Sequence, residues 1–356
     1  MERFAVLGMA QKHRDRYVQS HPILKNLPLN FGERFILKMA GPRITGTIKH
    51  NNNELGYIVD VPSFFVDWDI LSDEKRLKGI RRLLKILKER EIGIIIAPLL
   101  QQIFTKQEYE YCLDEGFILL DSFNIRLVSQ IEAVEKILAI LQKKLHKMNA
   151  FIWRADTELG EVWAEFLAPY FNYMALGGKD RARIKKLSER IIDSTGLACT
   201  NIDKMEDIID ESAAGNFVLV WTERFDPILK DMPKGLIIIS DPMDGGFFNR
   251  SWVGDGQIFM ESHILVESGW IEFPDDIYCS VDLSPLEELS VLEGIFYIMS
   301  EVYRSTVSSG RIDLKRVMKL RKLFELYPLY FRGFVSSNQF VSYNGFRRIY
   351  FRKIWK

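Results

Sequence analysis

The sequence predicts an α/β protein with a doubly wound parallel sheet at its centre. Short apolar runs that read as strands alternate with segments of helical spacing, and one strand–turn–helix junction, Phe151–Pro169, has the pattern of a phosphate-binding corner. We expect three parts: an N-terminal α/β domain at 1–128, a Rossmann-like domain at 129–277, and C-terminal helices that end in a β-hairpin at 278–356.

The composition excludes several classes of protein. Of 356 residues, 47% are hydrophobic and 27% are charged, and 48 basic residues balance 48 acidic ones, so no overall field points to nucleic acid. The apolar runs are shorter than the roughly 18 residues needed to cross a bilayer. The three cysteines are far apart and the five histidines form no zinc motif, so we expect no metal site and a cytoplasmic location.

The N-terminal domain alternates apolar strands with helices, which predicts a parallel sheet. Three asparagines at 51–53 predict a turn, since asparagine tolerates left-handed backbone conformations. The expected elements are the strands Phe4–Met9, Arg43–Ile48, Leu55–Val61, Ile92–Leu100 and Phe117–Leu120, and the helices Glu74–Glu91 and Lys106–Glu115.

A strongly amphipathic helix is expected at 129–148, where the next domain begins. Its C-terminal turn is basic, which complements the helix dipole. Two interpretations are open for its basic side chains: they form a solvated helix end, or they form a patch that faces a ligand. The residues are Lys143, Lys144, His146 and Lys147.

The Rossmann-like domain follows from a β-α-β-α-β order with short connections. Its expected elements are the strands Ala150–Trp153, Tyr173–Leu176, Ala198–Ile202, Phe217–Trp221 and Leu236–Ser240, and the helices Glu161–Leu167 and Arg181–Thr195.

The corner at Phe151–Pro169 lacks most of the glycines that such a corner uses for a tight turn, for close approach of phosphate, and for helix packing. Arg154 and Thr157 replace the first two glycines, and Gly160 remains. Arg154 either reaches a phosphate directly or fills the site, and the Thr157 side chain obstructs close approach. Nucleotide binding and a retained fold with an empty site are both open.

A basic loop follows the second strand of this domain. Gly178, Lys179, Arg181 and Arg183 favour the 2′-phosphate of NADP, whereas Asp180 keeps NAD open because an acidic residue there binds the ribose hydroxyls. The alternative is a solvated loop and helix start with no ligand.

Cys279 lies after a predicted turn at 274–276 and is a candidate nucleophile, because a thiol can accept an acyl group as a thioester. Asp282, three residues later, would relay or orient a proton if the segment were helical. The alternative is a buried structural cysteine.

The last segment predicts helices at Glu287–Ser300 and Leu314–Leu326. Asn344–Gly345 separates two aromatic and β-branched runs, which predicts a hairpin with a type I′ turn. Arginine and aromatic residues on this tail suit either peripheral contact with a membrane or protection of a strand edge against pairing.

Taken together, the segments resemble the long-chain acyl-carrier-protein reductases that form fatty aldehydes, a family also described as predicted amino-acid dehydrogenases. The resemblance covers nearly the whole chain. It rests on the following motifs in their shared order: His21-Pro22, Leu27-Pro28, LKMAGPRITGTI, GYIVDVP, the corner with its LG pair, LAPYFNYMALGGKDRAR, VESGWIEFP, YCSVD, Leu292-Glu293-Gly294 and Ser309-Gly310-Arg311.

The resemblance implies reduction of an acyl thioester by NADP, with acyl carrier protein or acyl-CoA as partner, Cys279 as acyl acceptor and Asp282 beside it. It implies cofactor contacts from Arg154, Ala155, Thr157, Leu159 and Gly160, and from Gly178, Lys179 and Arg181.

The chain departs from the family pattern in its loops. The family's glycine corner reads RADTELG here, and its T-G-N-S-x-T segment reads DSFNIR from Asp121. An alternative alignment would leave no cysteine at the position of Cys279. Two functions are therefore open: an NADP-dependent acyl-thioester reductase, and a non-catalytic relative that binds an acyl ligand or a protein partner such as a catalytic paralogue.

Overall fold

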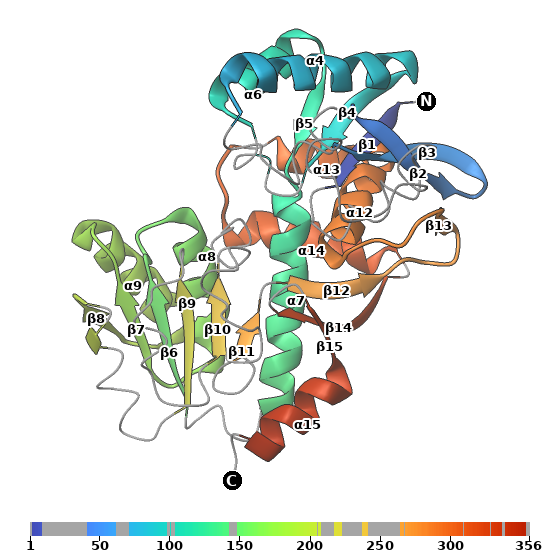
Figure 1. Ribbon diagram of the computed structural model, residues 1–356. Coiled ribbons are helices and arrows are strands. Elements are labelled where there is room, and N and C mark those ends of the chain that lie inside the picture. The colour runs from blue at the N-terminus through green and yellow to red at the C-terminus, as the bar shows by residue number, and fades with distance from the viewer. Residues whose placement is uncertain are drawn as a thin grey trace. The chain divides into compact units, whose positions relative to one another are not determined.

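The computed structural model describes residues 2–8, 41–61, 71–97, 100, 104–141, 148–204, 206–207, 217–222, 237–240, 264–266, 268–308, 310–327, 329–336 and 339–353. The chain divides into two compact units (Figure 1). Unit 1 comprises Met1–Ile125 and Phe273–Arg304, and unit 2 comprises Arg126–Glu272 and Ser305–Lys356. The C-terminal part that the sequence predicted as a third segment is thus divided between them.

Unit 1 is built on a six-stranded sheet with the order β13-β2-β3-β1-β4-β5. The four strands β3, β1, β4 and β5 are parallel, whereas β2 and β13 are antiparallel to their neighbours. The elements are β1 (Arg3–Gly8), β2 (Arg43–His50), β3 (Asn53–Asp60), α4 (Asp73–Glu89), β4 (Ile92–Ile96), α6 (Lys106–Asp114), β5 (Ile118–Leu120), β13 (Ile277–Cys279), α12 (Pro285–Met299) and α13 (Glu301–Val307), the last of which ends in unit 2.

Alternating side chains of β1 fill the cores on the two faces of this sheet. Ala5 and Leu7 pack with α4 and α6, whereas Phe4 packs with α12 on the other face. Gly294 on α12 allows this contact, since a methyl group there would lie 2.5 Å from the Phe4 ring. The expected asparagine turn is confirmed, because Asn51 and Asn52 have φ of 48° and 66°.

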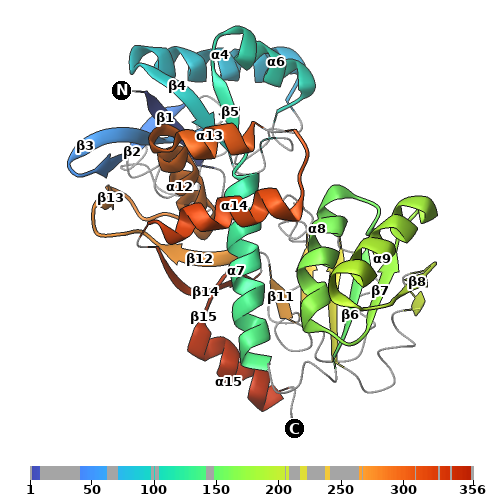
Figure 2. The same ribbon diagram turned by 180° about the vertical axis from the view of Figure 1, so that it is seen from behind.

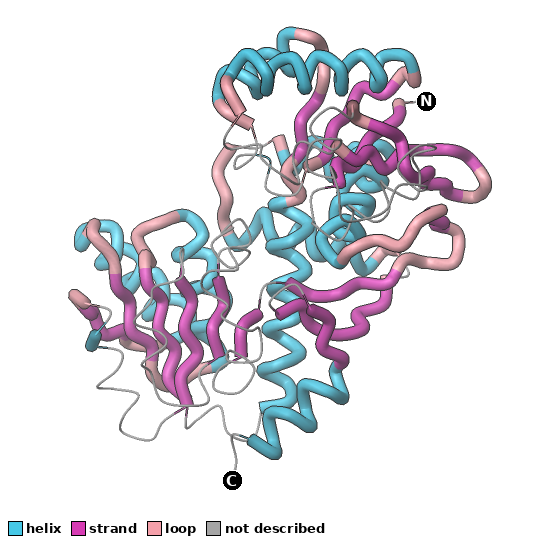
Figure 3. The backbone as a smooth tube through the Cα atoms, viewed as in Figure 1, coloured by secondary structure: helices cyan, strands magenta, loops and turns pink. Residues whose placement is uncertain are grey.

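Unit 2 contains the doubly wound sheet that the sequence predicted. Its six strands are all parallel in the order β11-β10-β9-β6-β7-β8, which is the 3-2-1-4-5-6 order of dinucleotide-binding folds. Figure 3 shows them side by side. The strands are β6 (Met148–Trp153), β7 (Met174–Gly177), β8 (Cys199–Ile202), β9 (Phe217–Thr222), β10 (Ile237–Ser240) and β11 (Ile264–Val266).

Two helices of unit 2, α8 (Glu158–Leu167) and α9 (Arg181–Thr195), cover the same face of this sheet (Figures 1 and 2). A short 3₁₀ turn, η4 (Ala168–Tyr170), follows α8. On α9 the buried residues Ile184, Leu187 and Ile191 have helical spacing, and Gly196 ends the helix at a φ of 77°.

Two further parts of unit 2, α14 (Leu314–Glu325) and an antiparallel sheet, contact the long helix α7 (Phe123–Leu141), of which the part from Arg126 on belongs to this unit. Arg321 on α14 forms ion pairs with Glu132 and Glu135 on α7. The antiparallel sheet β12 (Ser268–Glu272), β14 (Tyr330–Ser336) and β15 (Gln339–Ser342) approaches α7 at Gly269, where a methyl group would lie 2.6 Å from the carbonyl oxygen of Ser129.

The hairpin turn predicted at Asn344–Gly345 is wrong. These residues lie in the first turn of α15 (Tyr343–Lys353), and the hairpin is formed by β14 and β15 ahead of it. Ser342 explains the helix start, because its hydroxyl accepts a hydrogen bond from the Gly345 N–H at 2.9 Å. Phe346 is buried against the Phe334 ring, with 4.8 Å between ring centroids, and this contact needs helical rather than strand spacing.

Several expectations concern residues outside the described part of the chain, among them the basic helix end at 142–147 and the last three residues. In the described part, no helix has the length and apolarity that a membrane span requires, and no cluster of metal-ligating side chains is present.

Candidate functional site

The candidate site in unit 2 is the turn between β6 and α8. Arg154 follows β6 directly with a φ of 64°, the left-handed conformation that the first glycine of such a corner supplies. The N–H and the hydroxyl of Thr157 both donate to the Arg154 carbonyl oxygen, at 3.0 and 2.9 Å. The tight turn therefore persists without its glycine.

Gly160 keeps the packing role of the third glycine. A methyl group there would overlap with the Arg154 carbonyl oxygen and lie 2.8 Å from Cα of Ala155. Ala155 is fully buried, and its N–H donates to the Gly177 carbonyl oxygen at 2.8 Å. The first turn of α8 thus lies directly against the end of the strand.

The N-terminus of α8 is capped from within the chain. Thr157 is the N-cap residue, and its hydroxyl accepts a hydrogen bond from the Gly160 N–H at 3.1 Å. In a phosphate-binding corner the N–H groups of this turn point at the ligand. Here a side-chain oxygen takes one of them, and the Thr157 side chain stands at the glycine position where a pyrophosphate would make its closest approach.

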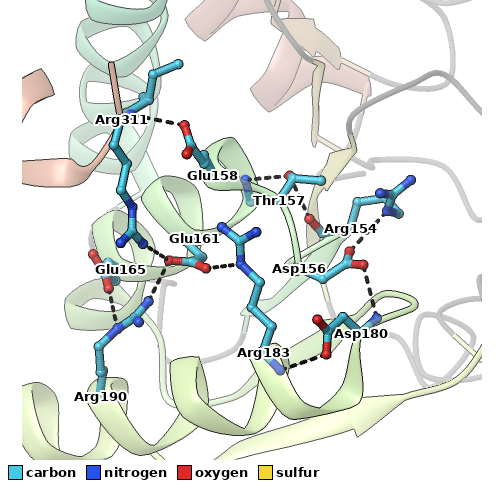
Figure 4. Close-up of polar contacts among 12 residues, drawn as sticks. Arg154, Asp156, Thr157, Glu158, Glu161, Glu165, Asp180, Arg183, Arg190 and Arg311 are labelled. Atoms are coloured by element: carbon cyan, nitrogen blue, oxygen red, sulfur yellow. Dashed lines mark hydrogen bonds and ion pairs between the residues drawn. The ribbon is translucent and has the colours of Figure 1, made fainter. Parts of the chain in front are cut away.

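Asp156 is the residue around which the corner is arranged (Figure 4). Its Oδ2 accepts hydrogen bonds from the backbone N–H groups of Lys179 and Asp180, at 3.0 and 3.1 Å, where the chain enters α9. Its Oδ1 accepts a hydrogen bond from Arg154 Nε at 3.0 Å. The side chain of Asp156 is only 7% exposed.

The environment of Asp156 favours its charged form. Burial by itself raises the pKa of this carboxyl, but hydrogen bonds from the Asp180 N–H, the Arg154 guanidinium and the Lys179 N–H outweigh burial and lower the pKa below its ordinary value. The carboxylate therefore acts as an internal anion at the end of β7, which is the place where a dinucleotide fold receives the adenosine ribose or its 2′-phosphate.

A second internal anion lies one turn along α8. Glu161 is buried and forms ion pairs with Arg183 and Arg190 on α9 and with Arg311, which precedes α14 (Figure 4). Burial raises the pKa of Glu161, but the hydrogen bonds from Arg183 and Arg190 outweigh it, so the pKa lies below its ordinary value. Each of these arginines has a protein carboxylate as its partner.

The segment before α14 also contacts the start of α8. Glu158 accepts a hydrogen bond from the Ile312 N–H at 3.0 Å, and Arg311 binds Glu161 at 3.1 Å. The sequence by itself predicted no role for Asp156, Glu158 or Glu161. The available signal was the motif Ser309-Gly310-Arg311, whose arginine is brought to α8 by the fold.

The other residues predicted to contact a cofactor have different roles. Leu159 is buried in the helix packing, and Arg181 forms an exposed ion pair with Asp203 at 2.9 Å. Lys179 contributes its backbone N–H to Asp156, while its side chain is exposed. Gly178 leaves room for the carboxylate, because a methyl group there would lie 2.8 Å from Cγ of Asp156.

The residues of this corner do not fit a bound dinucleotide in the arrangement seen. On the ribose side, Asp156 already takes the two backbone donors at the start of α9. On the pyrophosphate side, Thr157 takes a helix N–H and blocks close approach. Asp156, Glu158 and Glu161 would also repel the phosphates of an incoming nucleotide.

Cys279 and Asp282 lie in unit 1. Cys279 is half-buried on the edge strand β13, opposite Ile48 of β2, and packs against the apolar cluster beneath α12. The chain continues as irregular structure to the cap of α12 at Ser284, so the helical Cys279–Asp282 arrangement considered from the sequence is wrong. Asp282 is exposed.

The other two cysteines are poor nucleophiles. Burial is the main cause that raises the pKa of Cys112 to about 12 and that of Cys199 to about 11, so both thiols stay protonated at neutral pH. His50 pairs with Ile277 in the same ladder, two residue pairs from Cys279, and its Nε2 lies 2.9 Å from Oδ2 of Asp276.

No protein-family model matches this chain, and no curated protein matches it. Among solved structures, L-tryptophan dehydrogenase from Nostoc punctiforme has 11% identity and a TM-score of 0.39 over 99% of this chain and 87% of that one. Quinate dehydrogenase from Corynebacterium glutamicum in complex with NAD has 12% identity and a TM-score of 0.25 over 67% of this chain and 79% of that one.

A third similar structure is Δ(1)-pyrroline-2-carboxylate reductase from Thermococcus litoralis, in complex with NADH and L-proline. It has 15% identity and a TM-score of 0.25, and the match covers 36% of this chain and 40% of that one. At such identities and TM-scores these similarities assign neither an activity nor a ligand to this chain.

Proposed function

We propose that this chain is a non-catalytic binding protein on the scaffold of a dinucleotide-dependent oxidoreductase, with an acyl thioester as its ligand. The strand order of unit 2 supports the oxidoreductase-type scaffold. The sequence resemblance to acyl-carrier-protein reductases supports the choice of ligand. A fold of this kind does not by itself fix an activity, so the proposal depends on the corner.

The observation that carries the proposal is the position of the Asp156 carboxylate. It bonds the Lys179 and Asp180 N–H groups and the Arg154 side chain, which are the groups that would otherwise favour an anionic ligand. A dinucleotide would have to displace a charged, buried and fully hydrogen-bonded side chain. Displacement of such a group is costly because its donors lose their partner.

Calorimetric titration tests the proposal directly. We expect purified protein to bind a long-chain acyl-CoA saturably, to show no heat of binding with NADPH or NADH, and to leave NADPH unoxidised when both compounds are present. Saturable binding of either dinucleotide would contradict the proposal.

A variant of the corner sharpens this test. In Asp156→Ala the two backbone N–H groups at the start of α9 lose their internal partner, so we expect weak NADPH binding to appear. Asp203→Ala is the matched control, since it removes a carboxylate from an exposed ion pair of the same unit. Equal behaviour of the two variants would mean that Asp156 does not exclude the nucleotide.

A second candidate function is the NADP-dependent reduction of an acyl thioester. One observation favours it: burial keeps Cys112 and Cys199 as thiols, whereas Cys279 is only half-buried on the edge strand β13. In this function the Cys279 sulfur attacks the thioester carbonyl, and the carrier thiol leaves as the enzyme thioester forms.

Mass spectrometry after incubation with acyl-CoA separates the two functions. The reductase candidate expects an acyl adduct on Cys279, its loss in Cys279→Ser, and NADPH consumption that requires the cysteine. The binding-protein proposal expects the same acyl-CoA affinity in wild type and Cys279→Ser, with no adduct on either.

A further inference from the structure

A buried polar cluster in unit 1 has no place in either function above. Glu293 on α12 is 1% exposed. Its Oε2 accepts a hydrogen bond from the Ser122 N–H at 2.6 Å, and its Oε1 accepts one from the Tyr303 hydroxyl at 2.9 Å. Ser122 also bonds Ser290, with 2.7 Å between their hydroxyl oxygens, and Ser290 lies one turn before Glu293 on α12.

Among the residues that the structure describes, the buried carboxyl of Glu293 has uncharged hydrogen-bond partners, Ser122 and Tyr303. In the part of unit 1 that the structure describes, no lysine, arginine or histidine forms an ion pair with it. Burial and the negative charge of Asp121 raise its pKa to about 8, and the hydrogen bonds from Tyr303 and Ser122 offset this only in part. Glu293 therefore holds a proton at neutral pH.

Charged groups on α12, on α13 and before α7 either have other partners, are exposed, or act on Glu293 from a distance. On α12, Glu287 belongs to the helix cap at Ser284. On α13, Arg304 donates to the carbonyl oxygens of Tyr297 and Ile298, and Glu301 is exposed. On the connection before α7, Asp121 accepts a hydrogen bond from the Phe123 N–H at 3.0 Å, and it is the charge that acts on Glu293.

Both partners of Glu293 lie where the chain leaves unit 1. Ser122 is three residues before the unit ends at Ile125, and Tyr303 directly precedes Arg304, after which the chain again passes to unit 2. Ser122 is fully buried with a φ of 62°, a conformation that is unfavourable for a residue with a side chain. The bond from its N–H to Glu293 helps to hold that conformation.

We propose that Glu293 is a proton-dependent anchor, which in its neutral form ties both exits of the chain from unit 1 to α12 and which weakens when it loses its proton. The neutral carboxyl satisfies the Ser122 N–H through one oxygen and pairs with the Tyr303 hydroxyl through the other. In the described part of the chain, a negative charge at the same place is bound by uncharged groups of Ser122 and Tyr303 and lies near the negative charge of Asp121, so it is poorly stabilised.

The direction of the pH effect follows from linkage. The carboxyl has a pKa of about 8 in the folded protein and an ordinary value of 4.5 when exposed. The folded state thus binds more protons, and the contribution of the anchor is fully present below pH 4.5. This contribution is lost as the pH rises from 4.5 to about 8. Over that range, the equilibrium constant for opening of the anchor grows by up to about tenfold per pH unit.

The experiment compares wild type, Glu293→Gln and Glu301→Gln from pH 5 to pH 9, with unfolding free energy and backbone hydrogen exchange as readouts. Glutamine keeps a carbonyl oxygen that accepts from the Ser122 N–H, and its amide N–H can donate to the Tyr303 hydroxyl oxygen once that hydroxyl rotates, but it carries no proton equilibrium. Glu301→Gln removes the same charge from an exposed position of α13. Exchange rates are corrected for intrinsic pH dependence with the control variant.

We expect wild type and Glu301→Gln to lose stability, and protection at residues 122–125 and 303–304, as pH rises, whereas Glu293→Gln does not. The same pH dependence in Glu293→Gln as in wild type would overturn the proposal. Asp121→Asn provides an independent test. Removal of the Asp121 charge lowers the pKa of Glu293, so the loss of protection should move to lower pH. An unmoved transition in Asp121→Asn also overturns it.

Discussion

Gly178 leaves open the space that the Asp156 carboxylate fills: a methyl group on Gly178 would lie 2.8 Å from Cγ of Asp156. The two residues are 22 positions apart and come from the two consecutive strand–helix turns of unit 2. Their contact gives a physical reason for the glycine at position 178, directly after β7.

Gly178→Ala should therefore destabilise the protein through a steric clash. We expect a loss of about 1–3 kcal/mol in the free energy of unfolding, the range of overpacked sites, because Asp156 must move away from its donors. Chemical denaturation measures the change. Gly93→Ala serves as control, since a methyl group at Gly93 meets no atom within 4 Å, and equal stability of the two variants would refute the contact.

A pair of variants at Arg154 tests whether the turn after β6 is left-handed. Both Arg154→Ala and Arg154→Gly lose the hydrogen bond to Asp156, so their difference reports the backbone conformation alone. Since φ is 64°, we expect the glycine variant to be more stable by about 1 kcal/mol. Thermal unfolding of the two proteins checks this, and an alanine variant as stable as the glycine variant would show that the turn is not left-handed.

The lowered pKa of Asp156 predicts an acid-dependent contribution to stability. A carboxyl whose pKa is lower in the folded state stabilises it above the ordinary value, 3.8, and this contribution is lost as pH falls through the folded-state pKa. We expect Asp156→Asn to be less stable than wild type at pH 7, with the difference shrinking as the pH falls below 4.

Asp203→Asn is the control for this acid series. Asp203 forms an exposed ion pair with Arg181, and exposed pairs contribute little to stability. Urea denaturation at a series of pH values compares the three proteins. A gap between wild type and Asp156→Asn that does not change with pH would mean that the carboxylate of Asp156 is not specially stabilised.

The C-terminal helix provides a fourth prediction. Phe346 is 4% exposed and packs on Phe334, so Phe346→Ala should reduce the unfolding free energy by about 3–5 kcal/mol. Arg347→Ala, one residue along the same helix and exposed, should have little effect. Equilibrium unfolding of both variants decides whether the tail is a packed helix or the hairpin that the local sequence suggests.

Much of the fold could be predicted from local pattern. The alternation of Phe4 and Val6 with Ala5 and Leu7 marks a strand buried on both faces, and the helix predicted over Arg181–Thr195 has those bounds in the structure. These signals are short-range, since they depend on the periodicity of residues that are neighbours in sequence.

The tail shows where short-range signals mislead. Asn344–Gly345 is a strong turn signal, yet the chain forms a helix there because Ser342 caps it and Phe346 fits against Phe334. Burial of a phenylalanine outweighs the turn preference of two residues, and the partner strand that determines this burial is not adjacent in sequence.

The sequence alone determined the doubly wound class of unit 2, the loss of two glycines from its corner, and the packing role of Gly160. Only the tertiary structure decided what takes the place of the ligand. Asp156 meets the start of α9, and Glu161 meets Arg311 across 150 residues of chain. The physical reason is that hydrogen bonds and ion pairs need specific distances and directions, and the folded backbone sets these for residues that are far apart in the chain.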